Sequence, residues 1–554
     1  MEHERISLLN RSIWTFVWFA IVAVGTNAYW SWGSWSGFAV VGPLITLIGL
    51  VGMVGVWTIP FAHHRLFEHL TFATSLVVVA VTNGPVLAAT KYFSTDSAAF
   101  NQAATQLLVK GHNPYTAVFR PWMLQLNHPS DFWTYTLSGT HVDKVSYPAG
   151  SFVLQAPFQL LGLHHLGADW VDLLAWLAAA VILYVVSPNF AKWLSPLLLL
   201  ASLFTFTFVH GGTDALFVPF TMLAALRWDD FVTRRGPRWT AWLGPLALGV
   251  ACSIKQTPWF AVPFFLLVIA LEARRHHVAV ARTVARYASL VAAPFVALNL
   301  PFFVWSPGAW LHGVLLPLTQ PLVPDGQGLV SLATHGFVRV VHPLDLEVAG
   351  AMLLLALGAA IVTWYPTMKQ TWLFALPIAL FVPSRSLSSY LVDFVPAAFI
   401  AIISTQRVTD EWPRITRSAL RRGAAVAAPV AVSFVMMVLA FTSAPLSIKV
   451  DHYSAHDHNQ YMGPMTLTLT NHTSSGITPH VMVVIGSGHP VGFWTPDTTQ
   501  PLQVPPHSSV TMVWTPPRYM FAPEQYENWL VEVLTSKPGA LATTPAYRWP
   551  YSDR

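Results

Sequence analysis

The chain has 554 residues, of which 54% are hydrophobic and 10% are charged, and its formal net charge is +5. A soluble domain usually carries roughly a quarter charged residues, so this composition excludes an ordinary soluble globular protein and favours a polytopic membrane protein. The basic excess lies mostly in short segments between apolar runs, which is typical of cytoplasmic loops, so we expect no nucleic-acid partner.

Thirteen apolar runs predict transmembrane helices, some of them short enough to need tilt or local thinning of a hydrocarbon core ~30 Å thick. The first run has no Ala-x-Ala cleavage site and a second run follows at once, so it predicts an uncleaved span rather than a signal peptide. The single cysteine, Cys252, excludes an internal disulfide. The runs occupy residues 12–30, 38–60, 68–90, 169–187, 190–208, 213–227, 239–254, 258–272, 284–304, 347–365, 371–384, 389–405 and 424–444.

Three clusters of arginine, at residues 227–238, 274–286 and 407–422, indicate the orientation. Loops rich in lysine and arginine remain on the cytoplasmic side of a membrane, so we expect these clusters and the N-terminus there. Counting the spans then predicts that the extracytoplasmic segments are 210–214, 253–258, 306–346, 383–390 and the chain after residue 445.

One further apolar segment, residues 147–167, decides on which side the preceding loop lies. If this segment crosses the membrane, Asp96 falls on the cytoplasmic side, opposite the other outer loops. Pro148 and Pro157 interrupt it, and proline disrupts a plain helical span. We therefore expect it to lie at the interface, or to dip in and return, so that 91–168 forms a long outer loop with juxtamembrane helices.

The composition changes after Thr442. Four short segments there have alternating or β-branched character and are separated by turn residues, which predicts a small β-sandwich: "MTLTLTNHT", "HVMVVIGSG", "SVTMVWTPP" and "NWLVEVLTS". The predicted fold class is a polytopic α-helical membrane bundle of about 13 spans with a C-terminal extracytoplasmic β-sandwich. Its predicted parts are three spans in 1–90, the loop 91–168, a bundle in 169–445 that includes the outer loop 306–346, and the sandwich in 446–554.

Charged side chains recur in the segments that are predicted to be extracytoplasmic. Asp96 begins one loop, Asp214 follows a His-Gly-Gly turn, Lys255 lies between two apolar runs, and Arg385 lies in a short loop. Structural explanations are open for several of them: Thr95 and Asp96 could cap a helix, Asp214 could cap or pair, and Lys255 could snorkel. Ionisable groups at a membrane boundary are nevertheless costly unless they are paired, hydrated or functional.

Taken together, these groups fit one reaction. A carboxylate can accept a proton from an attacking hydroxyl, a lysine and an arginine can hold a phosphate as it leaves, and a membrane groove can hold a long lipid tail. This combination predicts glycosyl transfer from a lipid-phosphate sugar to an acceptor hydroxyl. The sequence has no Gly-rich cradle for a nucleotide.

Several motifs resemble those of GT-C-fold integral membrane glycosyltransferases, in particular the polyprenol-phosphate-mannose-dependent mannosyltransferase group. The pattern D-x₃-F…LL-x₂-G-x-NPY in 96–115 is similar to the first outer loop of that group. Four weaker motifs lie in residues 147–162, 210–226, 248–263 and 384–397: "YPAG…APFQLLG" resembles a Tyr-Pro-Pro-Leu helix, "HGGTDALFVPFTMLAAL" a Gly-Gln-x-Asn segment, "LGVACSIKQTPWFAVP" a Lys-Pro-Thr-Pro segment, and "SRSLSSYLVDFVPA" a late Ser-x-Arg…Tyr…Pro stretch.

The resemblance implies that Asp96 is the general base and that Lys255 and Arg385 bind the donor phosphate. It implies a polyprenyl-monophosphate donor of mannose or another hexose or pentose, and an extracytoplasmic glycan or glycolipid acceptor. The chain departs from the family in its three predicted spans before the catalytic loop, where one is common. The further substrate-binding candidates are Asp214, His210, His112, Asn113, Tyr115, Tyr147, Gln327 and Tyr390, although residues 111–115 could equally form a structural turn.

No cofactor is expected, and a divalent metal is not favoured. The outer acids and histidines that could bind a metal lack diagnostic ligand spacing; they are Asp96, His128, Asp131 and His141. Three other functions stay open. The protein could be a polysaccharide polymerase or ligase with diphosphate-linked lipid donors, a secondary transporter with charged groups deep inside its spans, or a scaffold that presents the β-domain.

Overall fold

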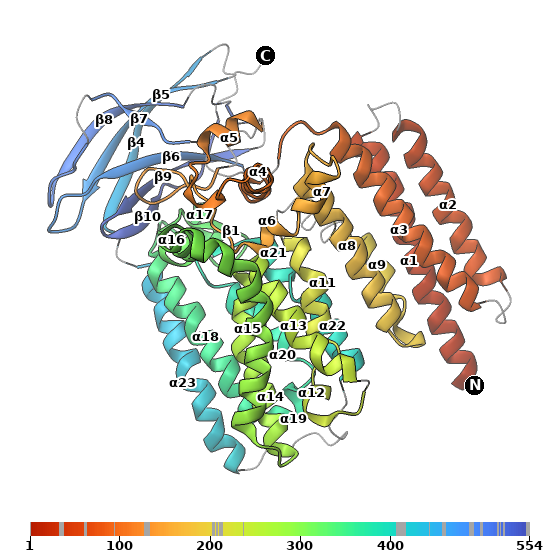
Figure 1. The fold of residues 1–554 in the computed structure, drawn as a ribbon. Coiled ribbons are helices and arrows are strands. Elements are labelled where there is room, and N and C mark those ends of the chain that lie inside the picture. Colours follow the sequence, from red (N-terminus) through yellow and green to blue (C-terminus); the bar gives the residue numbers. More distant parts are fainter. Residues whose placement is uncertain are drawn as a thin grey trace.

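The chain is mostly helical, with a C-terminal part rich in strands (Figure 1). The helices form a bundle whose upper end in Figure 1 carries the strands, whereas the start of α1 and the short helices α12 and α19 lie at the lower end. The computed structural model describes residues 2–32, 38–59, 64–93, 95–126, 133–201, 205, 209, 214–236, 238–405, 417–442, 444–456, 461–486, 492–498, 502–517, 520, 522–523 and 527–549.

Eight helices among the described residues are long and apolar enough to cross a membrane, and three further apolar segments are shorter. All of them coincide with runs predicted as spans, of which the sequence has thirteen. The long ones are α1 (Glu2–Trp32), α2 (Phe38–Thr58), α3 (His64–Ala89), α8 (Gly167–Val186), η5 (Thr257–Ala261) with α14 (Val262–Arg275), α15 (Val280–Trp305), α18 (Pro343–Thr363) and α23 (Arg417–Ala440). The shorter ones are α11 (Asp214–Ala225), α13 (Arg238–Ile254), and α21 (Ser388–Val392) with α22 (Val395–Ser404).

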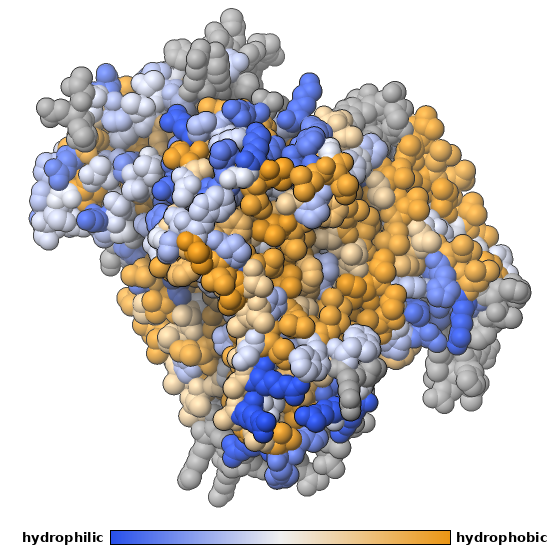
Figure 2. Space-filling model, in the orientation of Figure 1, coloured by the Kyte–Doolittle hydropathy of each residue, from blue (hydrophilic) through white to orange (hydrophobic). Residues whose placement is uncertain are grey.

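An apolar band runs across the bundle in Figure 2, between a more hydrophilic upper part and a hydrophilic lower end. Large side chains of α2, α15 and α23 are exposed along the bundle, among them Val51, Val54, Val304 and Phe434. Soluble monomers rarely expose apolar patches larger than a few hundred Å², whereas lipid covers such a surface without cost. The surface is therefore compatible with a membrane protein.

The segment between α3 and α8 lies at the upper end of the bundle and contains short helices (Figure 1). Two of them, α6 (Gly150–Val153) and α7 (Ala156–Leu160), cover the apolar stretch 147–167. At 1.5 Å per residue, neither helix approaches the ~30 Å thickness of a bilayer core. The helix that begins at Asp96, α4, thus lies at the same end of the bundle as the strands.

The remaining helical elements are short and connect the long helices. They are α4 (Asp96–Val109), η2 (Pro114–Thr116), α5 (Arg120–Gln125), η4 (Asn189–Ala191), α9 (Leu194–Leu200), α12 (Asp230–Thr233), α16 (Pro307–Thr319), α17 (Ser331–Thr334), α19 (Tyr365–Met368) and α20 (Trp372–Leu380). Two strands at the upper end, β1 (Asp325–Gly326) and β3 (Arg385–Ser386), pair in parallel and join two outer segments.

The C-terminal domain is built from two sheets, of order β4-β5-β8-β7 and β11-β9-β10-β2, with β6 also paired to β9. Met465, Leu467, Val481, Trp514 and Trp529 belong to the core between the sheets. The four predicted strands correspond to β5, β6, β8 and β9. The bounds are β2 (Val340–Val341), β4 (Leu446–His456), β5 (Tyr461–Asn471), β6 (Pro479–Ile485), β7 (Thr495–Pro496), β8 (Ser509–Thr515), β9 (Asn528–Ser536), β10 (Gly539–Thr543) and β11 (Tyr547–Arg548).

The sheet that contains β9 is buried on both faces. Burial roughly alternates along β8, but every residue of β9 between its two ends is buried. Val533 faces the core of the domain, whereas Leu534 packs in a cluster with residues of the outer loops and α18. The sheet is completed by β2, which comes from the outer loop 306–346 and pairs with β10. The β-domain is therefore joined to that outer loop by backbone hydrogen bonds as well as by packing.

Glu532 is the one acid of β9, and it is fully buried there; within the described part of the chain neither carboxylate oxygen has a hydrogen-bond partner. Burial raises its pKa to about 8, and the nearby Asp325 adds to the rise. The folded domain thus retains a proton that the unfolded chain releases from about pH 4.5 upwards, so this group lowers the stability as the pH rises towards 8.

We expect Glu532→Gln to raise the unfolding temperature of the protein at pH 8 and to leave it unchanged near pH 4.5. At one pKa unit per 1.36 kcal/mol, the stabilisation at pH 8 is on the order of a few kcal/mol. The control is Asp497→Asn, at an exposed acid of the same domain. An equal pH dependence of unfolding in Glu532→Gln and the wild type would contradict this explanation.

Candidate active site

Asp96 is the first residue of α4, and its carboxylate is bonded to a neighbouring loop. The preceding Thr95 caps the helix, because its side chain accepts a hydrogen bond from the N–H of Ala98. Asp96 Oδ2 accepts a hydrogen bond from the backbone N–H of Thr134 at 2.9 Å. Among the described residues this is the one hydrogen bond of the carboxylate, so Oδ1 remains able to accept a proton from a ligand.

Tyr147 lies nearby, and the backbone around it is held from three directions. The hydroxyl of Tyr115 donates to the Tyr147 carbonyl at 2.7 Å. The side-chain amide of Gln256 donates to the carbonyl just before Tyr147 at 2.8 Å. Asn299 Oδ1 accepts from the N–H of Ala149 at 2.9 Å. The predicted candidate Tyr115 therefore acts on the position of Tyr147, together with Gln256 and Asn299, which the sequence analysis did not identify.

A glycine allows this segment to approach the end of α13. A Cβ on Gly150 would lie 2.5 Å from the carbonyl oxygen of Ser253, so a larger residue would displace the chain. Ser253 is followed two residues later by Lys255. Gln256, where the resembling family often has proline, also donates to the Val314 carbonyl at 2.7 Å. These contacts explain how Tyr147 comes to lie against Lys255.

Lys255 is buried, and its ammonium is bonded to the Asp214 carboxylate. Only 5% of Lys255 and 1% of Asp214 is exposed. The rings of Tyr147 and Tyr390 lie 5.9 Å and 5.2 Å from Lys255 Nζ, within the range of cation–π attraction. A buried charge that loses its partner is strongly destabilising, so the pair holds together the segments that supply these four side chains.

Two further buried carboxylates, Asp172 and Asp393, lie within the electrostatic field of Lys255. Both are 0% exposed. The sequence analysis did not single them out, although each is an acid inside a run predicted as a span, which is itself a functional signal. With Asp214, three buried acids therefore surround one lysine among the described residues. The charge of Lys255 is already compensated by Asp214, which weakens its attraction for another anion.

Tyr147 connects Asp96 with Lys255. Burial raises the pKa of Tyr147 to about 12, the Lys255 ammonium opposes the rise, and the Asp96 carboxylate adds to it. Both charged groups therefore act on the same hydroxyl. Because this phenol stays protonated at neutral pH, it can donate a hydrogen bond to an oxygen of a ligand.

Arg385 lies in β3, next to the strand β1 of the outer loop. Its guanidinium donates to the Val323 carbonyl at 3.0 Å, and it acts electrostatically on Tyr390, the tyrosine that contacts Lys255. Arg385 is partly exposed and forms no ion pair within the described part of the chain. Most of its five N–H donors are therefore available to a ligand, unlike the ammonium of Lys255.

The other candidates from the first outer loop lie away from Asp96. His112 and Asn113 follow the C-terminal end of α4, whose 14 residues span about 21 Å. His112 is exposed. Asn113 Oδ1 accepts from the N–H of Tyr115 at 3.0 Å, which is the geometry of a structural turn. These two residues are therefore at the opposite end of α4 from the carboxylate.

Two candidates come from later outer segments. Gln327 is exposed, and its backbone N–H donates to the Ser386 carbonyl at 2.8 Å, which holds β1 against β3. His210 lies outside the described residues.

Of the possible metal ligands, His128 and Asp131 also lie outside the described residues. His141 packs against the ring of Trp133, with centroids 4.5 Å apart. Burial lowers its pKa, the charge of Arg120 lowers it further, and Asp143 opposes both. In the part of the chain that the structure describes, no group of three or more histidine, cysteine or acidic residues could hold a metal ion.

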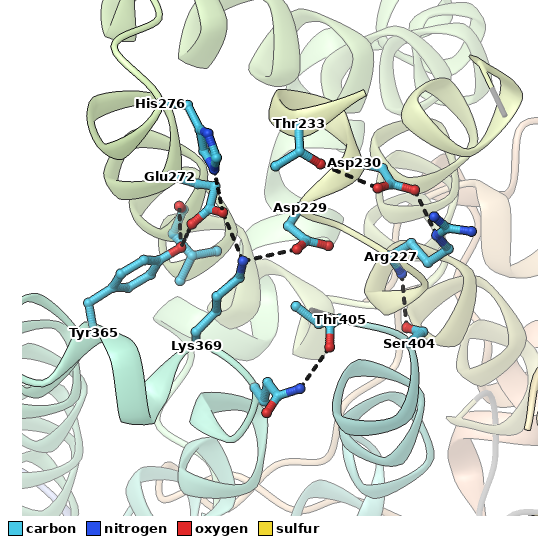
Figure 3. A network of polar contacts seen from close by, with 12 residues as sticks. Arg227, Asp229, Asp230, Thr233, Glu272, His276, Tyr365, Lys369, Ser404 and Thr405 are labelled. Carbon is cyan, nitrogen blue, oxygen red and sulfur yellow. Dashed lines mark hydrogen bonds and ion pairs between the residues drawn. The ribbon is translucent and has the colours of Figure 1, made fainter. Parts of the chain in front are cut away.

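A second buried polar network lies at the opposite end of the bundle (Figure 3). Lys369 donates to Asp229 at 2.9 Å and to Glu272 at 2.8 Å, and the Tyr365 hydroxyl donates to Glu272 at 2.6 Å. All three charged groups are buried. The network ties α14 and α19 to the turn before α12, close to Arg227 of the predicted cytoplasmic cluster.

Comparisons of the chain with protein-family models, with curated proteins and with solved structures find no match. The function therefore has to be inferred from the geometry of the site and from the motifs in the sequence.

The pair of Lys255 and Asp214 predicts strong coupling in a double-mutant cycle. Lys255→Met leaves a buried carboxylate without its partner, and Asp214→Asn leaves a buried ammonium, so each should cost about 3–5 kcal/mol of stability. We expect the double variant to unfold at a higher temperature than either single variant in detergent solution, because no uncompensated member of the pair remains. Additive losses would contradict the coupling.

Proposed function

We propose that the protein is a membrane glycosyltransferase that moves a sugar from a polyprenyl-monophosphate donor to an extracytoplasmic glycan or glycolipid. The observation that carries the proposal is that Lys255 lies against the rings of Tyr147 and Tyr390, while Asp96 acts electrostatically on Tyr147 and Arg385 acts on Tyr390. The motif resemblance to GT-C glycosyltransferases supports it. The apolar surface of the bundle supports a lipid-linked donor, since a polyprenyl chain partitions into the membrane.

In this mechanism Asp96 is the general base. Its free oxygen accepts the proton of the acceptor hydroxyl while that oxygen attacks C1 of the donor sugar. The new bond joins the acceptor oxygen to C1, and the bond between C1 and the phosphate oxygen breaks. Polyprenyl phosphate leaves with the electron pair, and the configuration at C1 inverts. The Thr134 N–H orients the carboxylate, which keeps Oδ1 available.

The two predicted phosphate-binding cations take different roles in this proposal. Lys255 is compensated by Asp214 and has two more buried acids nearby, so it orients Tyr147 and Tyr390. Arg385 keeps free donors, and a guanidinium binds phosphate oxygens in a bidentate manner. We therefore assign the departing phosphate to Arg385, with the Tyr147 hydroxyl as a second donor. Mannose, another hexose or a pentose fits this assignment equally.

The proposal includes a location. The protein is a multi-pass protein of the cell membrane, with its N-terminus in the cytoplasm and its site and β-domain outside. Three arginine clusters in the sequence support this orientation. In the structure, α12 and the start of α1 lie at the end of the bundle opposite the β-domain (Figure 1), as this orientation requires.

We expect Asp96→Asn to lower the rate of sugar transfer by about 10²–10⁴-fold, the usual effect of removing a positioned general base. The unfolding temperature should change little. The measurement is transfer by purified protein in lipid nanodiscs, and Asp143→Asn, at an acid of the same outer loop, is the control. Turnover like that of the wild type in Asp96→Asn would exclude Asp96 as the base.

The same assay separates the two classes of lipid donor. Transfer from polyprenyl-monophosphate sugars, with little or none from diphosphate-linked sugars, is the expected result. Arg385→Gln should then raise the donor KM and lower kcat, because the phosphate loses its bidentate partner. Transfer from diphosphate-linked donors alone would favour a polysaccharide polymerase or ligase.

A secondary transporter is the second candidate, because the buried pair of Lys255 and Asp214 has a counterpart in the buried network of Lys369 at the opposite end of the bundle, which Figure 3 shows. In a transporter such networks would open alternately. Solute flux in proteoliposomes that is abolished by Lys369→Met would identify the protein as a transporter and not a glycosyltransferase. We expect no such flux, because Lys369 is bonded to two carboxylates and we interpret this network as one that holds the helices together.

A further inference from the structure

The C-terminal β-domain contacts the same loop that holds Asp96. We propose that this domain is a positioning element of the candidate active site, and that Phe493 and His480 hold the segment that sets the distance between Asp96 and Arg385. This inference rests on the proposed function and deepens it. Under this inference the β-domain takes part in the reaction by positioning the site, in addition to any binding of the acceptor.

The segment belongs to a hairpin, residues 133–142, whose two sides are joined by a bridge between Tyr135 and His141. Thr134 of this hairpin donates its backbone N–H to Asp96 Oδ2 at 2.9 Å. A displacement of the hairpin therefore moves the donor on which the orientation of the carboxylate depends.

The next residue of the hairpin, Tyr135, is connected to Arg385 by two hydrogen bonds. The Tyr135 carbonyl accepts from the N–H of Val323 at 2.9 Å, and the Val323 carbonyl accepts from the Arg385 guanidinium at 3.0 Å. Two consecutive residues, Thr134 and Tyr135, thus connect the proposed base to the proposed phosphate-binding cation. Asp96 and Arg385 supply the only side chains in this path, and the rest of it is backbone.

The β-domain packs against the hairpin from the other side. The ring of Tyr135 lies edge-on against Phe493, with centroids 5.1 Å apart, and Phe493 lies 5.8 Å from the His480 ring. Gly139, at the hairpin turn, has φ +79°, and a Cβ there would overlap the His480 ring. The hairpin therefore has no room to move towards the β-domain.

An apolar cluster strengthens this contact. Leu137 is 1% exposed and belongs to one cluster with Met482, Leu534 and Leu541 from β6, β9 and β10. The hairpin and the loop 306–346, together with residues of α18 and α23, cover the second face of this sheet, so the hairpin and the sheet bury each other's apolar side chains.

The first test is Phe493→Ala, with Tyr453→Ala as the matched control, because Tyr453 packs on Trp529 of the same domain with centroids 5.0 Å apart. Misplacement by ~1 Å can cost about 10²-fold in rate, so we expect kcat per folded molecule to fall about 10- to 100-fold in Phe493→Ala. The donor KM should stay unchanged. Phe493→Tyr, which keeps the ring, should retain kcat, as should Tyr453→Ala. An unchanged kcat in Phe493→Ala overturns the proposal.

If Phe493→Ala does not fold, Gly139→Ala provides a second variant. Its new Cβ meets the His480 ring and displaces the hairpin, so kcat should fall as in Phe493→Ala. An unchanged kcat in Gly139→Ala would overturn the positioning role of this contact.

A spectroscopic measurement separates this proposal from the proposed function. A nitroxide on Ser138→Cys, in a Cys252→Ala background that removes the single native cysteine, reports the motion of the exposed hairpin turn. We expect an immobilised spectrum that becomes mobile in Phe493→Ala but not in Tyr453→Ala. An unchanged spectrum overturns the positioning role of Phe493, whatever reaction the protein catalyses. If the spectrum changes as expected but the wild-type protein transfers no sugar, the proposed function is wrong and the positioning role of Phe493 stands.

Discussion

The buried ion pair between Lys255 and Asp214 determines how the helices meet at the end of the bundle that carries the β-domain. A lysine inside an apolar bundle is stable only with a carboxylate beside it, since neither lipid nor apolar side chains can replace water around an ammonium. That requirement brings the start of α11 to the end of α13. The rings of Tyr147 and Tyr390 then cover the ammonium and add the first outer loop and α21 to the same place.

The pair builds only one side of the candidate site. Asp96 comes from a helix outside the bundle, and a backbone N–H of the 133–142 hairpin orients its carboxylate. The hairpin is in turn packed between the outer loop 306–346 and the β-domain. One side of the site is therefore fixed by electrostatics within the bundle, and the other by the packing of a sheet that needs cover on both faces.

The networks at the two ends of the bundle differ in a way that bears on function. Lys369 is bonded to two carboxylates, one of which also accepts a tyrosine hydroxyl, and its partners come from the helices and turns of the bundle itself (Figure 3). Lys255 is bonded to Asp214, and two further buried acids and the rings of two tyrosines lie near it. Among the described residues, the carboxylate oxygens of those two acids, Asp172 and Asp393, lack a hydrogen-bond partner.

By itself the sequence determined the class of fold, because the length and apolarity of a span and the alternation of a strand are local properties. It also singled out Asp96, Lys255 and Arg385 as charged groups in short segments next to apolar runs. Only the tertiary structure decided that Lys255 is already compensated by Asp214, and that the turn after α4 lies at the far end of that helix from Asp96. The hydrogen bonds that hold Tyr147 and the contact of the β-domain with the hairpin join residues up to about 400 positions apart. Such a separation leaves no local pattern in a single sequence.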